Sequence, residues 1–226
     1  MLFKQIVLIS LFSLIAQFGI SQVLISDVEE KRLVNSSVMD YLQDQQNHDI
    51  NKFDDIEPSL NPDEDVSGYK KQVLDYYFKG NPDVALNSYI NNATGKAWNN
   101  RNVKLNLLFS KKTETLFYNG DELGPLDNEQ VVYLNLSFLF GLYNLPMAFE
   151  ITEIDDKNLS IEFSYIKGNK SEGKQQLNFV KSRKGYTRIE HWSYYSSKSF
   201  LRDYLLYPYF HKKLTDSFHR NLRKSI

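Results

Sequence analysis

The side chains best suited to chemistry lie in one predicted strand, residues 186–195. They are Arg188, Glu190, His191, Trp192 and Tyr194. Successive side chains of a strand point to opposite faces, so His191 faces away from the other four. If those four face a cavity, Arg188 and Glu190 could orient a ligand among aromatic rings. In the alternative, this charged pair lies on the solvent side, with Ile189 and Tyr195 pointing inward.

Two more histidines, His211 and His219, lie eight residues apart in a predicted C-terminal helix, and His48 lies in a polar region. Metal-binding pairs on a helix are usually four residues apart, and Thr215 occupies that position here. The acidic clusters at 63–65 and 155–156 lack the spaced oxygen ligands and the glycine of a calcium loop. We therefore predict no metal site, no cofactor and no assigned catalytic residue.

The sequence lacks the residues or motifs by which several enzyme classes are recognised. The chain has no cysteine, which excludes disulfides, thiol nucleophiles and thiolate metal sites. No G-x-S-x-G nucleophile motif occurs. The glycines of residues 168–173 fit a hairpin better than a phosphate-binding loop. The sequence does not specify a reaction.

The elements that would position these residues follow from periodicity. Apolar spacing predicts helices over residues 67–79 and 82–94, the second with Asn81 as N-cap and Pro82 in its first turn. Alternating patterns predict strands over 101–109, 113–118, 130–138, 148–154, 159–166, 174–180 and 186–195. A long helix over 199–224 closes the chain, and Pro208 should kink it. We expect an α+β fold: a curved antiparallel sheet of six or seven strands gripping a long C-terminal helix, with N-terminal helices.

Three regions are expected along the chain. Residues 1–21 have a basic residue, an apolar run and small residues before Gln22, as a cleavable signal peptide does. A membrane anchor is the alternative, but it needs about 20 apolar residues. Residues 22–66 are polar and acidic and are predicted to be a partly ordered extension. Residues 67–226 form the predicted domain, and the protein is expected to be exported, periplasmic or secreted, and soluble.

Charge is distributed unevenly. Residues 181–226 carry 11 Lys and Arg against 3 Asp and Glu. This excess suits an acidic protein or an anionic lipid surface, although a solvated helix face is the favoured explanation. Export and the lack of a recognised module argue against nucleic acid as a partner.

Two segments resemble a known family. Residues 163–179 (FSYIKGNKSEGKQQLNF) resemble a strand, glycine loop and strand motif, and residues 207–218 (YPYFHKKLTDSF) resemble an aromatic-proline helix. Together they are similar to a bacterial and plant family of unknown function, related to the START-like, helix-grip (SRPBCC-type) proteins. The resemblance covers about residues 97–226. Lys167 and residues 169–171 depart from the family loop, which is commonly Gly-Thr and His-rich.

The resemblance implies a grip-shaped cavity for lipids, sterols or polyketides. It supplies no catalytic residues, although some members of the superfamily are cyclases or hydrolases. The leading hypothesis is an exported protein that binds a hydrophobic or amphipathic small molecule under the C-terminal helix. The predicted ligand-binding residues are Phe149, Phe163, Tyr165, Phe179, Arg188, Glu190, Trp192 and Tyr194. The alternatives are an acid–base cyclase or hydrolase using Glu190, Arg188 and a cavity tyrosine, and an envelope accessory protein acting through protein or membrane-surface contacts.

Overall fold

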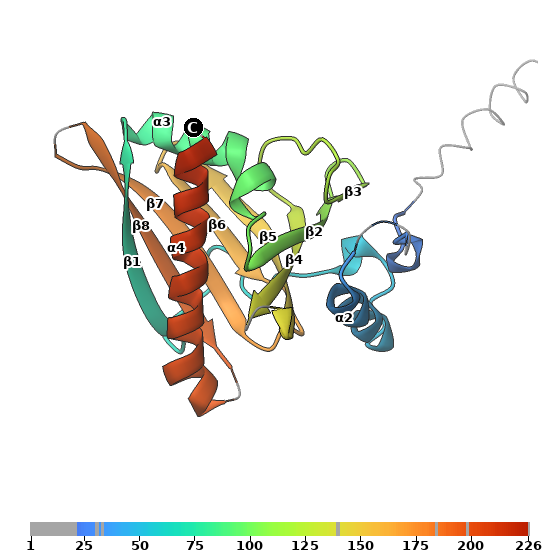
Figure 1. Ribbon diagram of the computed structural model, residues 1–226. Helices are drawn as coiled ribbons and strands as arrows, with labels where there is room; N and C mark the ends of the chain where they lie inside the picture. Colours follow the sequence, from blue (N-terminus) through green and yellow to red (C-terminus); the bar gives the residue numbers. More distant parts are fainter. Residues whose placement is uncertain are drawn as a thin grey trace, which may run out of the picture.

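The structure is a computed structural model that describes residues 22–29, 32, 34–138, 141–183, 185–197 and 199–225. These residues form one eight-stranded antiparallel sheet with helices on both faces (Figure 1). The strand order is β1-β8-β7-β6-β5-β4-β2-β3. The strands are β1 (Lys70–Lys79), β2 (Val103–Ser110), β3 (Thr115–Tyr118), β4 (Gln130–Phe138), β5 (Tyr143–Asp155), β6 (Ser160–Tyr165), β7 (Glu172–Lys181) and β8 (Tyr186–Ser196).

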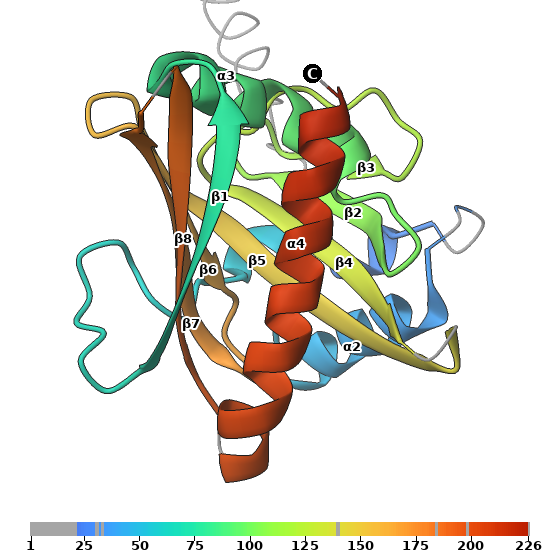
Figure 2. The same ribbon diagram turned by 60° about the vertical axis from the view of Figure 1, so that its left-hand side comes forward.

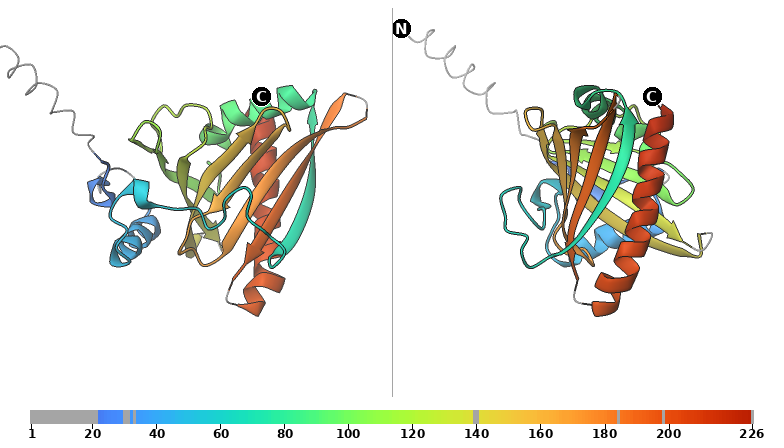
Figure 3. Two further views of the ribbon diagram at one scale, coloured as in Figure 1. Left: turned by 180° about the vertical axis from the view of Figure 1, so that it is seen from behind. Right: turned by 90° about the vertical axis from the view of Figure 1, so that its left-hand side faces the viewer.

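The two faces of the sheet have different covers. One face, here called the α4 face, is crossed by the long helix α4 (Tyr207–Ser225) and by α3 (Pro82–Asn92) (Figures 1 and 2). The opposite face, here called the α2 face, carries α2 (Ser36–Asn47) over β4 and β5 (Figure 3). The expected α+β architecture, an antiparallel sheet closed over a long C-terminal helix, is thus present.

The helix predicted over residues 67–79 is wrong, because this segment is the edge strand β1. It pairs with β8 without a break from Lys70↔Tyr195 to Lys79↔Tyr186. Apolar and aromatic residues are dense here, so both helical and strand spacings can be found in the pattern. Side chains such as Val73 and Tyr77 favour a strand, and ten paired positions on β8 decide the outcome. The sheet therefore has eight strands and not six or seven.

Strand β5 also begins earlier than predicted, at Tyr143, and includes Pro146. A proline cannot donate a ladder hydrogen bond and is confined to positions whose N–H side is unpaired. Pro146 pairs with Asn135 of β4, whereas pairing with β6 starts only at Phe149. The first residues of β5 thus have one strand neighbour, which accommodates the proline.

Helix α3 starts at Pro82 as predicted, although the Asn81 side chain makes no capping hydrogen bond. A π-helical turn, η3 (Ala93–Ala97), continues it toward the cavity. The C-terminal helix likewise begins with a π-helical turn, η5 (Arg202–Leu206). Its Tyr207 N–H donates to the Arg202 carbonyl. The helix expected to be kinked at Pro208 thus departs from α-helical geometry in the turn just before that residue. Pro208 has no N–H, so one helical hydrogen bond is missing there.

The described residues between 22 and 60 supply side chains that pack against the α2 face. They include the single turns η1 (Ile25–Asp27) and η2 (Phe53–Asp55) besides α2. Phe53 is fully buried, with its ring stacked on Phe109 of β2 at 5.1 Å. Val38 and Leu42 of α2 are buried in the same cluster. The region predicted as an extension therefore contributes a second hydrophobic core. The predicted signal peptide lies outside the described residues.

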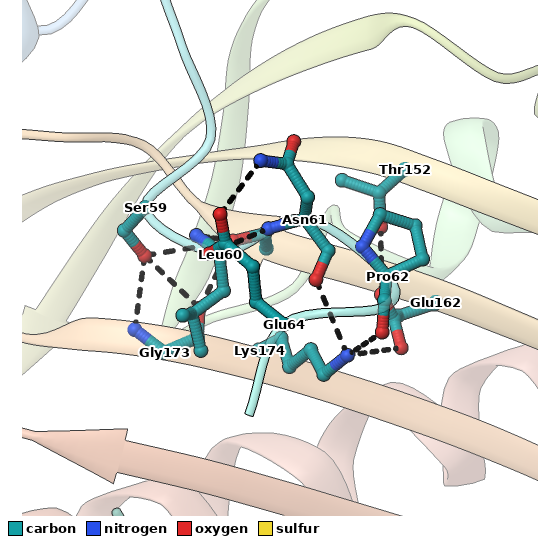
Figure 4. A network of polar contacts seen from close by, with 10 residues as sticks. Ser59, Leu60, Asn61, Pro62, Glu64, Thr152, Glu162, Gly173 and Lys174 are labelled. Atoms are coloured by element: carbon teal, nitrogen blue, oxygen red, sulfur yellow. Dashed lines mark hydrogen bonds and ion pairs between the residues drawn. The ribbon is translucent and has the colours of Figure 1, made fainter. Parts of the chain in front are cut away.

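A polar network fixes the end of this N-terminal segment to the sheet (Figure 4). The Lys174 ammonium lies 3.1 Å from Glu162, and both side chains are less than 10% exposed. Lys174 also donates to the carbonyl of Pro62, and Thr152 donates to Glu162 at 3.2 Å. Burial raises the pKa of Glu162, and the neighbouring Lys174 opposes that rise.

The same network includes Gly173, whose N–H donates to Ser59 Oγ at 3.0 Å. Its φ is +132°, and a Cβ here would lie 2.0 Å from the Tyr194 carbonyl oxygen. Only glycine allows strands β7 and β8 to approach this closely at the point where the N-terminal segment crosses them.

Candidate functional site

A cavity of about 600 Å³ lies between α4 and the sheet. Its walls come from the start of β2, from β4 to β8, the β6–β7 loop, η3 and the C-terminal helix. Most of the lining side chains are aromatic or aliphatic. Those named in the argument below are Trp98, Leu136, Phe149, Phe163, Phe210 and Phe218. A concave, mostly apolar space of this size is typical of small-molecule sites.

Aromatic rings contact one another around the apolar part. The Trp98 ring meets Phe149 edge-on at 5.3 Å and stacks with Phe218 of α4 at 6.0 Å. Phe149 in turn contacts Phe163 at 5.1 Å. Such ring pairs are favourable beyond their buried area and hold the walls in defined positions. The apolar wall is thus built from separate elements of the chain.

One wall of the cavity is polar and buried. Gln175 of β7 lies between two histidines: its Oε1 is 2.7 Å from His191 Nε2 and 2.9 Å from His211 Nε2. Gln175 Nε2 donates to the Tyr165 hydroxyl at 2.7 Å. The Tyr165 hydroxyl in turn lies 2.6 Å from the Tyr207 hydroxyl. All five side chains line the cavity. A ligand would therefore meet amide, imidazole and phenol groups here.

The polar wall continues into the core behind it. His191 Nδ1 lies 3.0 Å from His219 Nε2, and His219 Nδ1 lies 2.6 Å from the Tyr89 hydroxyl. Tyr76 of β1 stacks on the His219 ring at 3.7 Å. Neither His219 nor Tyr89 lines the cavity, so they support His191 from behind and fix its ring orientation.

The three buried histidines are uncharged at neutral pH. Burial lowers the pKa of His211 to about 3, and burial lowers the pKa values of His191 and His219 well below the ordinary range. A neutral imidazole has one N–H. If His211 donates through Nδ1 to Gln72 Oε1, 2.9 Å away, its Nε2 accepts from Ser193. In that arrangement His211 Nε2 and Gln175 Oε1, 2.9 Å apart, are both acceptors, so this part of the wall suits a ligand group that donates a hydrogen bond.

Charge appears only at the entrance. We define the mouth as the lining residues that are themselves exposed: Tyr143, Lys170, Leu206, Tyr209 and Lys213. Arg202, partly buried, also lines the cavity, and its guanidinium donates to the Lys170 carbonyl at 2.6 Å. Among the described residues, no Asp or Glu lines the cavity. An anionic group would thus be favoured at the mouth, and a neutral polar group inside.

The predicted site residues divide into two groups. Phe149, Phe163 and Tyr165 line the cavity. Phe179 does not line it; its ring is buried against Tyr89 at 5.1 Å.

The other four predicted residues, Arg188, Glu190, Trp192 and Tyr194, do not line the cavity. They point to the opposite face of β8, as the alternative interpretation of that strand held. Arg188 and Glu190 form an ion pair there. Lys71 of β1 lies over the Trp192 ring at 3.9 Å. The placement of these four in a cavity, and an acid–base reaction there through Glu190 and Arg188, is therefore wrong.

Sequence reasoning missed His191, Gln175 and His211. The alternation along β8 already separated His191 from the four residues that were favoured, so the choice of face was the error. His211 and Gln175 gave no local signal, because each meets its partners only through the packing of α4 onto the sheet. Among the described residues, no group of three or more His, Asp or Glu is arranged to hold a metal ion.

No protein-family model and no curated protein matches the sequence. Among solved structures, protein Ms6760 from Mycobacterium smegmatis aligns at a TM-score of 0.50 with 13% identity, over 76% of this chain and 95% of that chain. TTHA0849 from Thermus thermophilus gives 0.47 and 12%, over 69% and 95%. Norcoclaurine synthase from Thalictrum flavum gives 0.45 and 11%, over 73% and 94%.

The alignment with Ms6760 shows a shared fold. The antiparallel sheet with a long C-terminal helix across one face is the α+β arrangement expected from the sequence. Membership of a particular family within that fold stays a prediction.

Proposed function

We propose that this protein binds a hydrophobic or amphipathic small molecule in the cavity beneath α4. The observation that carries the proposal is the cavity itself: about 600 Å³, walled by aromatic side chains and furnished with a buried polar wall. Pockets of this composition use apolar surface for affinity and a few fixed polar groups for orientation. Shape and chemistry thus support ligand binding.

The polar wall narrows the class of ligand. Gln175, His191 and His211 are uncharged, and the cations that line the cavity, Lys170, Arg202 and Lys213, lie toward its mouth. Burying an ionised group beside neutral partners is costly, whereas a hydroxyl can donate to the acceptors of this wall in place of water. We therefore propose a ligand that places a neutral hydroxyl group against Gln175 and its apolar part among the rings of Trp98 and Phe149.

We also propose that the protein acts outside the cytoplasm. The support is the leader-like composition of residues 1–21 and the lack of cysteine. Among the described residues, no helix is both long enough and apolar enough to cross a membrane.

The two tryptophans provide the test. Trp98 lines the cavity and Trp192 lies on the other face of the sheet. In Trp192→Phe, the fluorescence of Trp98 should change and saturate on titration with dodecanol. The matched variant Trp98→Phe, which keeps only Trp192, should show no such change.

A second variant separates cavity binding from surface adsorption. Leu136→Trp in a Trp192→Phe background would place an indole in the existing space. Because the larger side chain occupies part of the void, it should leave thermal stability unchanged or higher while weakening dodecanol binding. Equal binding by this variant and by its Trp192→Phe parent would refute the cavity as the site. Dodecanol should also bind more tightly than dodecanoate if the buried wall receives the polar group.

A further inference from the structure

The first turns of the C-terminal helical segment expose an unusual amount of apolar surface. Six side chains between residues 200 and 209 are 43–75% exposed. They are Phe200, Leu201, Tyr204, Leu205, Leu206 and Tyr209. At about 200 Å² for each full side chain, they present roughly 700 Å² of mostly apolar surface. The largest such patch on a typical monomer is about 300–600 Å², and larger ones mark interaction sites.

This segment is folded and held in place. Asp203 is buried, and its carboxylate accepts a hydrogen bond from the Ser197 N–H at 3.2 Å. The Phe200 and Tyr204 rings stack at 4.3 Å, and Lys70 donates to the Tyr204 hydroxyl at 2.5 Å. Figures 1 and 2 show the η5 turn projecting past the end of the sheet. The apolar side chains are therefore presented outward on a fixed support.

The charges around the segment are mainly basic. Arg202, Lys212 and Lys213 lie on the helical segment, and Lys170 lies on the adjacent loop. Lys212 is ion-paired with Asp216 at 2.6 Å, and Glu172 is exposed at the start of β7, so the basic excess comes from Arg202, Lys213 and Lys170. The one carboxylate between residues 199 and 213 belongs to Asp203, which is 9% exposed. A surface that combines exposed Phe, Leu and Tyr with basic side chains matches the interface of a bilayer that contains anionic lipids.

The patch is continuous with the mouth of the cavity. Leu206 and Tyr209 belong to both. On the other side of the mouth, Leu142 is 88% and Tyr143 is 51% exposed. The Phe210 ring, 4.6 Å from Phe138 of β4, connects the helix with that side. Apolar surface thus flanks the entrance on two sides.

We propose that residues 200–209 dock this protein onto an anionic lipid surface, with the mouth of the cavity turned toward the bilayer. A bilayer suits the geometry better than a folded partner. The exposed side chains surround a projecting turn, which can enter a fluid interface. This inference goes beyond ligand binding, because docking does not require an occupied cavity.

The test measures sedimentation with vesicles, using the chain that begins at Gln22. Vesicles of phosphatidylcholine with about 30% phosphatidylglycerol should bind the protein, and binding should weaken in high salt and with pure phosphatidylcholine. The double variant Phe200→Ser/Leu205→Ser removes two of the exposed apolar side chains and should reduce vesicle binding at least tenfold. Neither residue lines the cavity, so dodecanol binding should be unchanged. The control Val84→Ser removes an apolar side chain that is 50% exposed on α3 and should bind as wild type does.

Three results would overturn the proposal. One is an absence of binding to the anionic vesicles, and another is equal binding by the double variant. The third is self-association without vesicles that the double variant abolishes, which would show that a second copy covers the patch. Near-ultraviolet circular dichroism confirms that each variant is folded. Because dodecanol titration of Trp98 is measured separately, a failure of docking is distinguishable from a failure of ligand binding.

Discussion

Acidification from pH 7.5 to 5.5 should destabilise this protein through His191, His211 and His219. All three are at most 7% exposed and have lowered pKa values. An unfolded histidine has a pKa of about 6.5. Below that pH the unfolded chain binds more protons than the folded one, so the free energy of unfolding falls as the pH falls. Above about pH 6.5 these histidines are mostly neutral in the unfolded chain as well, so they no longer lower the free energy of unfolding.

The magnitude follows from the same linkage. At pH 5.5, one unit below the unfolded pKa, each neutral buried histidine costs about 1.4 kcal/mol. Three of them cost about 4 kcal/mol, a large fraction of the roughly 5–15 kcal/mol typical of a domain. The buried Glu150 and Glu162, whose pKa values are raised by burial, act in the opposite direction. Substituting one histidine at a time separates its contribution to the pH-dependent loss of unfolding free energy from that of the two glutamates.

The assay is urea unfolding at the two pH values. Wild type should lose up to about 4 kcal/mol of unfolding free energy, and His211→Gln should reduce that loss by about 1.4 kcal/mol. His48 is exposed, so His48→Gln is the matched control and should leave the loss unchanged. An unfolding free energy that is the same at both pH values in wild type and His211→Gln would refute the reasoning.

Three further substitutions test the structure. Gly173→Ala should lower the unfolding free energy by more than about 2 kcal/mol, since the new Cβ would collide with the Tyr194 carbonyl; unchanged thermal unfolding would contradict the close approach of β7 and β8. Lys174→Met should cost about 3–5 kcal/mol in urea unfolding by leaving Glu162 buried without its cation, and adding Glu162→Gln should recover part of that loss. Phe53→Ala should cost about 3–5 kcal/mol, and a negligible loss would show that residues 22–66 do not belong to the core.

Much of the fold was predictable because its strongest signals are local. The alternation after residue 101 and the long stripe of the C-terminal helix both appear as expected. The segment at residues 70–79 was misassigned because its dense aromatic residues fit two periods, and only pairing with β8 distinguishes them. The core role of Phe53 was equally invisible, since its partner Phe109 lies far away in the sequence.

The site was predictable in part for the same reason. Alternation correctly grouped Phe163 with Tyr165, and the C-terminal helix was expected to cover them. On β8, the face could not be chosen from the pattern, because both sets of side chains mix polar and aromatic residues. The decisive contact is between His191 and His219, which joins two elements by tertiary packing and follows from no spacing along the chain.

Native mass spectrometry of the gently purified protein tests ligand binding most directly. Wild type should carry a small molecule of defined mass that is released on denaturation, or should take up one equivalent of dodecanol when delipidated. Leu136→Trp, with its cavity narrowed, should bind less of either. A wild-type protein that stays empty with dodecanol in excess, or a Leu136→Trp variant that binds as well as wild type, would contradict the account.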